Sequence, residues 1–97
     1  MSYLYVISEE KNPTICKIGF SKNPEKRIKT FQTGHPEKLK LYYYELFTET
    51  SIRKFESIVH KNLKHYKFNN EWFQISPDDA IAEIQFLKIR YENEKYL

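Results

Sequence analysis

The sequence predicts a small α+β domain, in which a mainly antiparallel sheet is flanked by helices in the order β-β-α-β-α-β-α. Three observations predict this fold class. Two short apolar runs follow each other at the start of the chain, a third strand-like run is rich in tyrosine, and segments with helical spacing alternate with these strands. Because we find no internal repeat and no linker, we expect one domain over residues 1–97, with a motif-bearing core at 3–75 and a last helix at 77–93.

Composition limits the class of protein. The 97 residues are 40% hydrophobic and 16% aromatic, which is typical of a folded domain and not of a disordered chain. The single cysteine, Cys16, excludes an internal disulfide framework and a zinc site of clustered cysteines. No apolar run has the length of a membrane span and no signal peptide is evident, so we expect no membrane partner and an intracellular location, in cytoplasm or nucleus. A net charge of +3 permits a phosphate-rich partner without requiring one.

The first two strands are predicted over Tyr3–Ile7 and Ile15–Phe20, because both runs are apolar and a turn-prone segment separates them. Gly19 lies near the end of the second strand, where a missing side chain lets a ligand or another backbone approach closely. The first helix is predicted over Pro24–Gln32, since Asn23 suits an N-cap and proline suits the first helical position.

The first helix is expected to end at Gly34, in the left-handed conformation that glycine favours after a helix. The third strand is predicted over Leu39–Phe47, from its aromatic and β-prone composition. Strict alternation along this strand predicts two faces, one with Leu39, Leu41 and Tyr43 and the other with Lys40, Tyr42 and Tyr44.

The second helix is predicted from about Thr48–Ser51 to about Tyr66. Its core stripe recurs at spacings of three and four residues and consists of Ile52, Phe55, Val59 and Leu63. Glu56 and His60 lie one turn apart on a neighbouring polar row. A fourth strand is predicted over Glu71–Ile75, followed by the last helix, with Ser76 as its N-cap.

An ordered set of motifs runs through this chain. Tyr3-Leu4-Tyr5 lies on the first predicted strand and Lys17-Ile18-Gly19 on the second, and Arg27 and Glu56 follow on the two helices. This set resembles the motifs of the GIY-YIG nuclease superfamily. Lys17, the pairing of Glu56 with His60, and Glu71-Trp72-Phe73 resemble in particular the small GIY-YIG-like domain of phage T5-type and fungal meiotic proteins, which is described as DNA-binding.

The resemblance implies a metal-dependent DNA endonuclease that hydrolyses phosphodiester bonds with Mg²⁺ or Mn²⁺ as cofactor. It implies that Glu56 binds the metal and that Arg27 holds the scissile phosphate, because its planar fork matches phosphate oxygens. Tyr5 is implied as the general base or as the group that orients water, and Lys17 as a second contact to the phosphate. His60 is implied as an acid, a base or a partner of Glu56.

Each of these residues also has a structural interpretation. Glu56 could be a solvated helix residue that pairs with Arg53 or His60, Arg27 could be one more surface cation, and Tyr5 could be a buried strand tyrosine. Lysine replaces the family's second tyrosine, and its closing asparagine is not evident, so a non-catalytic DNA-binding module on the same fold is a second hypothesis. A protein-interaction domain that uses the tyrosine-rich strand is a third.

Lysines near the first helix and the third strand are expected to form a surface that follows a phosphate backbone. Aromatic side chains among them would suit stacking on unpaired bases. The alternative is a solvated helix face beside a half-buried sheet. Because a domain of this size contacts few base pairs, sequence specificity would need a homodimer or a partner domain. The lysines with this expected role are Lys22, Lys26, Lys29, Lys38 and Lys40.

Overall fold

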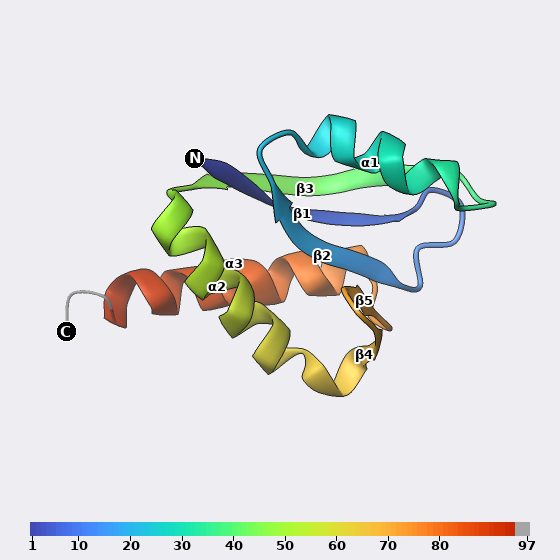
Figure 1. The fold of residues 1–97 in the computed structure, drawn as a ribbon. Helices are drawn as coiled ribbons and strands as arrows, with labels where there is room; N and C mark the ends of the chain where they lie inside the picture. The colour runs from blue at the N-terminus through green and yellow to red at the C-terminus, as the bar shows by residue number, and fades with distance from the viewer. Residues whose placement is uncertain (95–97) are drawn as a thin grey trace.

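The structure, a computed structural model, describes residues 1–94 and arranges helices around a five-stranded sheet (Figure 1). The strands are β1 (Ser2–Glu9), β2 (Cys16–Ser21), β3 (Leu39–Phe47), β4 (Lys67–Asn69) and β5 (Trp72–Phe73). The helices are α1 (Pro24–Thr33), α2 (Glu49–Asn62) and α3 (Pro77–Glu94), with a 3₁₀ turn η1 (Lys64–Tyr66) after α2. The strand order is β3-β1-β2-β5-β4 and the four pairings are antiparallel, so the predicted α+β fold is confirmed.

Helix α1 covers one face of the sheet, and α2 and α3 cover the other (Figure 1). Side chains of β1 alternate between these faces. Leu4 and Val6 enter the larger core with Phe55 of α2, whereas Tyr5 and Ile7 enter a smaller core that α1 completes. All five side chains are at most 1% exposed. The central position of β1 therefore explains its nearly continuous apolar sequence.

A β-bulge in β3 changes which side chains share a face. Val6 pairs with Tyr43 but Ile7 pairs with Leu41, so one residue of β3 is left over in the register. Tyr43 consequently packs against the larger core, whereas Leu41 packs in the smaller core under α1. The predicted alternation that placed these two side chains on one face is wrong, because a bulge shifts the side-chain period by one residue. Beyond the bulge it is Tyr44 that faces the α1 side, opposite Tyr5.

The segment after α2 also differs from the prediction. The helix predicted to continue to about Tyr66 ends at Asn62, and the last turn before the sheet is 3₁₀. The next residues form an extra strand, β4, which pairs with β5 across a turn at Asn70. Asn70 has φ of 42°, a left-handed conformation that asparagine tolerates better than most residues. The sheet therefore gains a fifth strand at its edge.

The helix starts follow the predicted capping. Asn23 Oδ1 accepts a hydrogen bond of 3.1 Å from the Lys26 N–H, and Ser76 Oγ accepts one of 3.2 Å from the Asp79 N–H. The helix end at Gly34 does not follow the prediction. Its φ is −102°, outside the left-handed region, and its N–H donates to the Phe31 carbonyl oxygen over 3.3 Å, so α1 ends without a left-handed glycine.

Helix α3 carries apolar side chains on two sides. Ala80, Ile84 and Leu87 are buried against the sheet, as the predicted helix requires. Phe86 and Ile89 lie on the outer side and are 55% and 61% exposed. Among the described residues, neither α3 nor any other helix is both long enough and apolar enough to cross a membrane.

Candidate functional site

The polar residues singled out above lie at an open edge of β2. Strand β5 pairs with β2 only at Cys16 and Lys17, and in the described chain β2 continues beyond that point with β1 on one side and no strand on the other. At this edge, groups outside the sheet ladder form the hydrogen bonds with the β2 backbone. The Ile18 N–H donates to the Glu71 carbonyl over 3.0 Å, and the Ile18 carbonyl accepts from His60 Nε2 at 2.9 Å. A side chain of α2 and the residue before β5 therefore meet at this edge.

Gly19 leaves the space in which two side chains meet. It is the β2 partner of Tyr5, whose hydroxyl donates to Glu71 Oε1 over 3.3 Å. A Cβ atom on Gly19 would lie 2.3 Å from Glu71 Oε1 and 2.6 Å from the Tyr5 hydroxyl oxygen. Contacts this short are not possible, so the missing side chain is required for the Tyr5–Glu71 contact. The close approach expected at Gly19 is thus present.

Two cations lie beside Tyr5 on the ring of Phe31, which α1 supplies. Lys17 Nζ is 4.3 Å and Arg27 Cζ is 4.7 Å from the centre of that ring. The negative face of an aromatic ring attracts cations at such distances. The Tyr5 ring lies 6.3 Å from the same ring centre. The Phe31 ring of α1 therefore gathers one cation from β2 and one from α1, and the α1 cation, Arg27, interacts with the Tyr5 hydroxyl.

Burial and the nearby charges decide the protonation of Tyr5 and Lys17. Burial, together with the Glu71 carboxylate, raises the pKa of Tyr5 far above its ordinary value, although Arg27 opposes this shift. Burial also lowers the pKa of Lys17, which Glu71 opposes and Arg27 reinforces. Tyr5 is therefore a protonated hydrogen-bond donor at neutral pH. This favours a role in orienting a ligand over a role as general base.

Glu56 and His60 approach the same edge from α2, and both are half-buried. Burial, followed by the charge of Glu71, raises the pKa of Glu56 to about 7, while Lys67 opposes the shift. Burial lowers the pKa of His60, which its bond to the Ile18 carbonyl opposes. Within residues 1–94, no hydrogen bond or ion pair engages the Glu56 carboxylate, so neither of the partners considered for it, Arg53 and His60, holds it.

The donor set fits a hard divalent cation. A half-buried carboxylate close to a second carboxylate is stabilised in its charged form when a cation binds beside it. Mg²⁺ is commonly held by one or two carboxylates together with waters and phosphate oxygens. The described residues contain no group of three or more His, Cys, Asp or Glu side chains that could form a protein-only cage. Glu56 with Glu71 nearby matches the one-or-two-carboxylate arrangement.

The six motif residues reach this edge, which we call the β2-edge site, from two faces of the sheet: one group lies on the α1 side, Glu56 and His60 come from α2 on the other side, and Glu71 interacts with both groups. The members of the site are Tyr5, Lys17, Gly19, Arg27, Glu56 and His60, with Glu71 in addition. Sequence reasoning did not assign a role to Glu71, although it influences the pKa values of four of the others. The sequence signals for Glu71 were its place at the start of the predicted fourth strand and its part in the Glu71-Trp72-Phe73 resemblance. Neither signal shows that the strand is short enough to leave β2 open.

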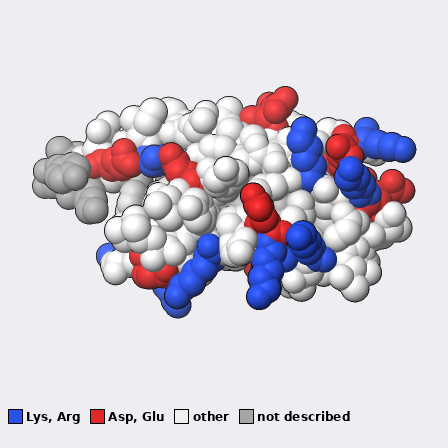
Figure 2. All heavy atoms as spheres, turned by 90° about the horizontal axis from the view of Figure 1, so that it is seen from above, with Lys and Arg blue, Asp and Glu red and all other residues white. Residues whose placement is uncertain are grey.

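The expected five-lysine surface is only partly present. Lys22, Lys26 and Lys29 are exposed on α1 or just before it. Figure 2 views the molecule from the α1 side, where Lys and Arg side chains are interspersed with acidic ones. Lys38 pairs with Glu10 at 3.5 Å. Lys40 alternates with the leucines packed under α1 and so projects from the opposite face of β3, away from the other lysines.

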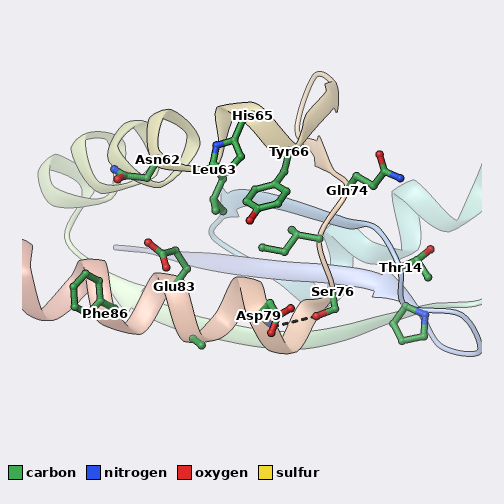
Figure 3. Close-up of a pocket in the computed structure, with 13 residues that line it drawn as sticks. Thr14, Asn62, Leu63, His65, Tyr66, Gln74, Ser76, Asp79, Glu83 and Phe86 are labelled. Carbon is green, nitrogen blue, oxygen red and sulfur yellow. Dashed lines mark hydrogen bonds between the residues drawn. The ribbon is translucent and has the colours of Figure 1, made fainter.

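A separate cavity of about 890 Å³ lies between the end of α2 and α3 (Figure 3). Tyr66 and Gln74 line it from one side, and Asp79 and Glu83 of α3 line it from the other. Carboxylates at this position would repel a phosphate group. This cavity is therefore distinct from the β2-edge site and does not match an anionic ligand.

Fold and site together define a small α+β domain with two cations and two carboxylates at an open sheet edge. The chain belongs to the T5orf172 domain family, whose model matches residues 2–88. It is also 32% identical over 75 residues to a protein described as KilA-N domain-containing protein 315L of Invertebrate iridescent virus 6. That match covers 76% of this chain and 32% of the relative, so the chain spans about a third of the relative's length. No solved structure matches the chain significantly. The phage T5-type part of the expected resemblance is confirmed by the family match.

Proposed function

We propose that the domain binds DNA at the β2-edge site and, as a GIY-YIG-type endonuclease, hydrolyses a phosphodiester bond there. The observation that carries the proposal is that Tyr5 meets Arg27 and Glu71 beside Gly19, and that Glu71 also interacts with Glu56 of α2. Membership of the T5orf172 family and the similarity to a KilA-N domain-containing viral protein support DNA as the partner.

In this proposal the cations hold the phosphate. Arg27 presents a planar guanidinium at the exposed end of the site, and such a group can donate two parallel hydrogen bonds to phosphate oxygens. Lys17 adds a second charge on the same Phe31 ring. The Tyr5 hydroxyl interacts with both Arg27 and Glu71, so it can donate a hydrogen bond to a phosphate oxygen or a water once the Glu71 carboxylate binds another group.

Glu56, with Glu71 nearby, is the proposed holder of a divalent cation, Mg²⁺ or Mn²⁺. When bound, the ion supplies charge stabilisation for the phosphate and a lowered pKa for a bound water. His60 donates its Nε2 proton to the Ile18 carbonyl, which leaves Nδ1 as the ring atom that can accept a proton. The low pKa of His60 keeps that nitrogen unprotonated at neutral pH.

A second candidate function is a non-catalytic DNA-binding module. It is favoured by the raised pKa of Tyr5, which excludes a resting phenolate base, and by lysine at the position of the second motif tyrosine. In that case the same cations hold the phosphate backbone without cleavage. Both functions predict DNA binding, and only the first predicts turnover.

Incubation of the purified chain with plasmid and with single-stranded DNA, with and without Mg²⁺ or Mn²⁺, separates the two functions. We expect metal-dependent nicking by the wild type, no nicking by Glu56→Ala, and full nicking by Lys54→Ala, which removes an exposed charge from the same helix. DNA that stays intact with the wild type in either metal, while binding persists, would overturn the nuclease and retain the binding module.

Arg27→Ala tests the phosphate contact. Because Arg27 is exposed, we expect DNA binding to weaken while the melting temperature stays within about 4 °C of the wild type. A larger fall in melting temperature would show that Arg27 stabilises the packing of α1 instead of serving only as a phosphate contact.

Sequence specificity is proposed to come from a second copy of the chain or from a partner domain, seated on the outer side of α3. Phe86 and Ile89 expose two large apolar side chains one helical turn apart on that side.

A further inference from the structure

Part of the sheet face that α1 shields remains open. The first residues of β1 and the last residues of β3 extend past the start of α1 (Figure 1). Tyr3 and Tyr44 lie there with ring centres 5.6 Å apart and ring planes at 75°, an edge-to-face arrangement. Tyr44 is 57% exposed. An edge-to-face contact covers only part of the Tyr44 ring, so the rest of the ring is accessible to a ligand.

The β-bulge in β3 puts this pair next to the β2-edge site. Because of the bulge, Tyr44 lies directly opposite Tyr5, and it faces the α1 side of the sheet. Tyr3 precedes Tyr5 by two residues, so it shares the same face about 7 Å along the strand. The residue that carries the exposed ring thus neighbours Tyr5, whose hydroxyl bonds Glu71.

A cavity of about 300 Å³ opens between these rings and the start of α1. Tyr3, Tyr44 and Leu41 give it an apolar wall. Its other side carries the polar groups of Lys22 and Asn23 and one carboxylate, Glu25, so the cavity suits an uncharged ring and not the phosphate itself. Its volume lies at the low end for small-ligand sites, and its mixture of aromatic wall and few polar groups is typical of such sites. Lys22 adds a positive charge at the rim.

We propose that the Tyr3–Tyr44 cavity receives one unpaired nucleobase of the DNA whose phosphate Arg27 holds. This inference rests on the proposed function and narrows its substrate class to DNA with a single-stranded, bulged or extruded nucleotide. The exposed Tyr44 ring stacks on the base, an interaction that every base can make. Lys22 lies where it can contact the adjoining phosphate. A paired base cannot enter, because neighbouring bases cover its faces in a duplex.

The test measures binding of three DNAs to the full chain by fluorescence anisotropy, without divalent cations so that no strand is cut. The DNAs are a fully paired duplex, the same duplex with one extrahelical 2-aminopurine, and the single strand. We expect the bulged duplex to bind about tenfold more tightly than the paired duplex at equal salt. We also expect quenching of 2-aminopurine fluorescence on binding, because stacking on an aromatic ring quenches it.

Tyr44→Ala should weaken binding of the bulged duplex by about 5- to 100-fold and abolish the quenching, with less than a twofold effect on the paired duplex. Tyr44→Phe keeps the ring and should retain wild-type binding. Tyr66→Ala is the matched control, because Tyr66 is another exposed tyrosine, on η1. Since Tyr44 is largely exposed, its loss should not unfold the chain. Equal binding of bulged and paired duplexes, or an unaffected Tyr44→Ala, would overturn the inference.

The same experiment separates this inference from the proposed function. Arg27→Ala on the paired duplex reports the phosphate contact alone. If it weakens binding while Tyr44→Ala does nothing, the DNA-binding site stands and the base cavity fails. If Tyr44→Ala is effective and Arg27→Ala is not, the base cavity stands and the phosphate contact fails. Absence of binding to all three DNAs would overturn both.

Discussion

Gly19 cannot take a side chain unless its neighbours shift, because Tyr5 and Glu71 fill the space that a Cβ atom would occupy. The Glu71 carboxylate ends a flexible side chain and can swing aside, whereas the Tyr5 ring is buried and cannot move away without cost. The motif glycine thus has a direct physical role, which is to let a tyrosine and a carboxylate meet above the backbone.

Gly19→Ala is therefore expected to lower the free energy of unfolding by about 1–3 kcal/mol, as overpacking does. It should also weaken DNA binding, because the Tyr5–Glu71 contact would be displaced. Urea unfolding measures the first effect. Gly34→Ala is the control, since no atom lies within 4 Å of its added Cβ. Similar losses for both variants would contradict the crowding argument.

The raised pKa of Glu56 makes the free energy of unfolding depend on pH. Its pKa is about 7 in the folded chain against an ordinary value of 4.5, so the unfolded state releases this proton more readily and stability falls as pH rises from about 4.5 to 7. Glu56→Gln should therefore raise the free energy of unfolding at pH 8 by about 1–2 kcal/mol, after allowance for solvent screening, with no gain at pH 4. Glu37→Gln, an exposed glutamate, controls for loss of charge. An equal gain at both pH values would contradict the assignment.

At the scale of elements, α1 buries few residues for the role proposed for it. Pro24 is its only buried residue, and Ile28 and Phe31 pack against the smaller core from a half-buried position. Yet α1 carries Arg27 and borders the Tyr3–Tyr44 cavity. Its N-cap therefore matters more than it would in a helix held by a wide apolar face.

Asn23→Ala should lower the free energy of unfolding by about 1 kcal/mol, because it removes the acceptor for the Lys26 N–H. A decrease in DNA affinity should accompany it, since the start of α1 positions the cations. Asn23→Ser retains a capping oxygen and should restore most of the stability. Thermal unfolding followed by circular dichroism is the measurement. Equal losses for the two variants would show that capping is not the cause.

At the scale of the whole molecule, the number of positive side chains on the α1 side predicts how strongly DNA binding depends on salt. Three to four phosphate contacts from Lys22, Lys26, Lys29 and Arg27 would give a slope of log K against log salt of about −3 to −4 on duplex DNA. Lys26→Ala should reduce the magnitude of the slope by about 1. Lys40→Ala should leave it unchanged, because Lys40 projects from the other face of the sheet. Binding that does not depend on salt would contradict every nucleic-acid function proposed here.

The exposed apolar side chains on the outer side of α3 predict that two copies of the chain associate through this helix. If a second copy covers it, sedimentation should show dimers that the double substitution Phe86→Ser and Ile89→Ser converts to monomers. Both side chains are exposed, so the fold should survive their loss. Leu46→Ser, which removes an exposed apolar side chain from β3, is the control. A monomeric wild type at high concentration would leave α3 to a partner domain and exclude the second copy.

Much of the fold follows from local sequence, because it depends on neighbours in the chain. The order of the first elements, the bounds of β3, the caps at Asn23 and Ser76 and the buried character of β1 were predictable from spacing and residue type. The motif residues and their place at one edge were expected from a resemblance and not from local spacing.

Tertiary structure alone decided the rest. The bulge after Leu41, the β4–β5 hairpin, the approach of Glu71 to Gly19 and the outward direction of Lys40 all depend on register between strands far apart in the chain. A shift of one residue in that register reverses which face each side chain occupies, and no local pattern records it. The sequence by itself therefore determined which residues are available for chemistry. Strand pairing determined which of them meet: Tyr5 with Glu71 across Gly19, and Tyr3 with Tyr44 beside them.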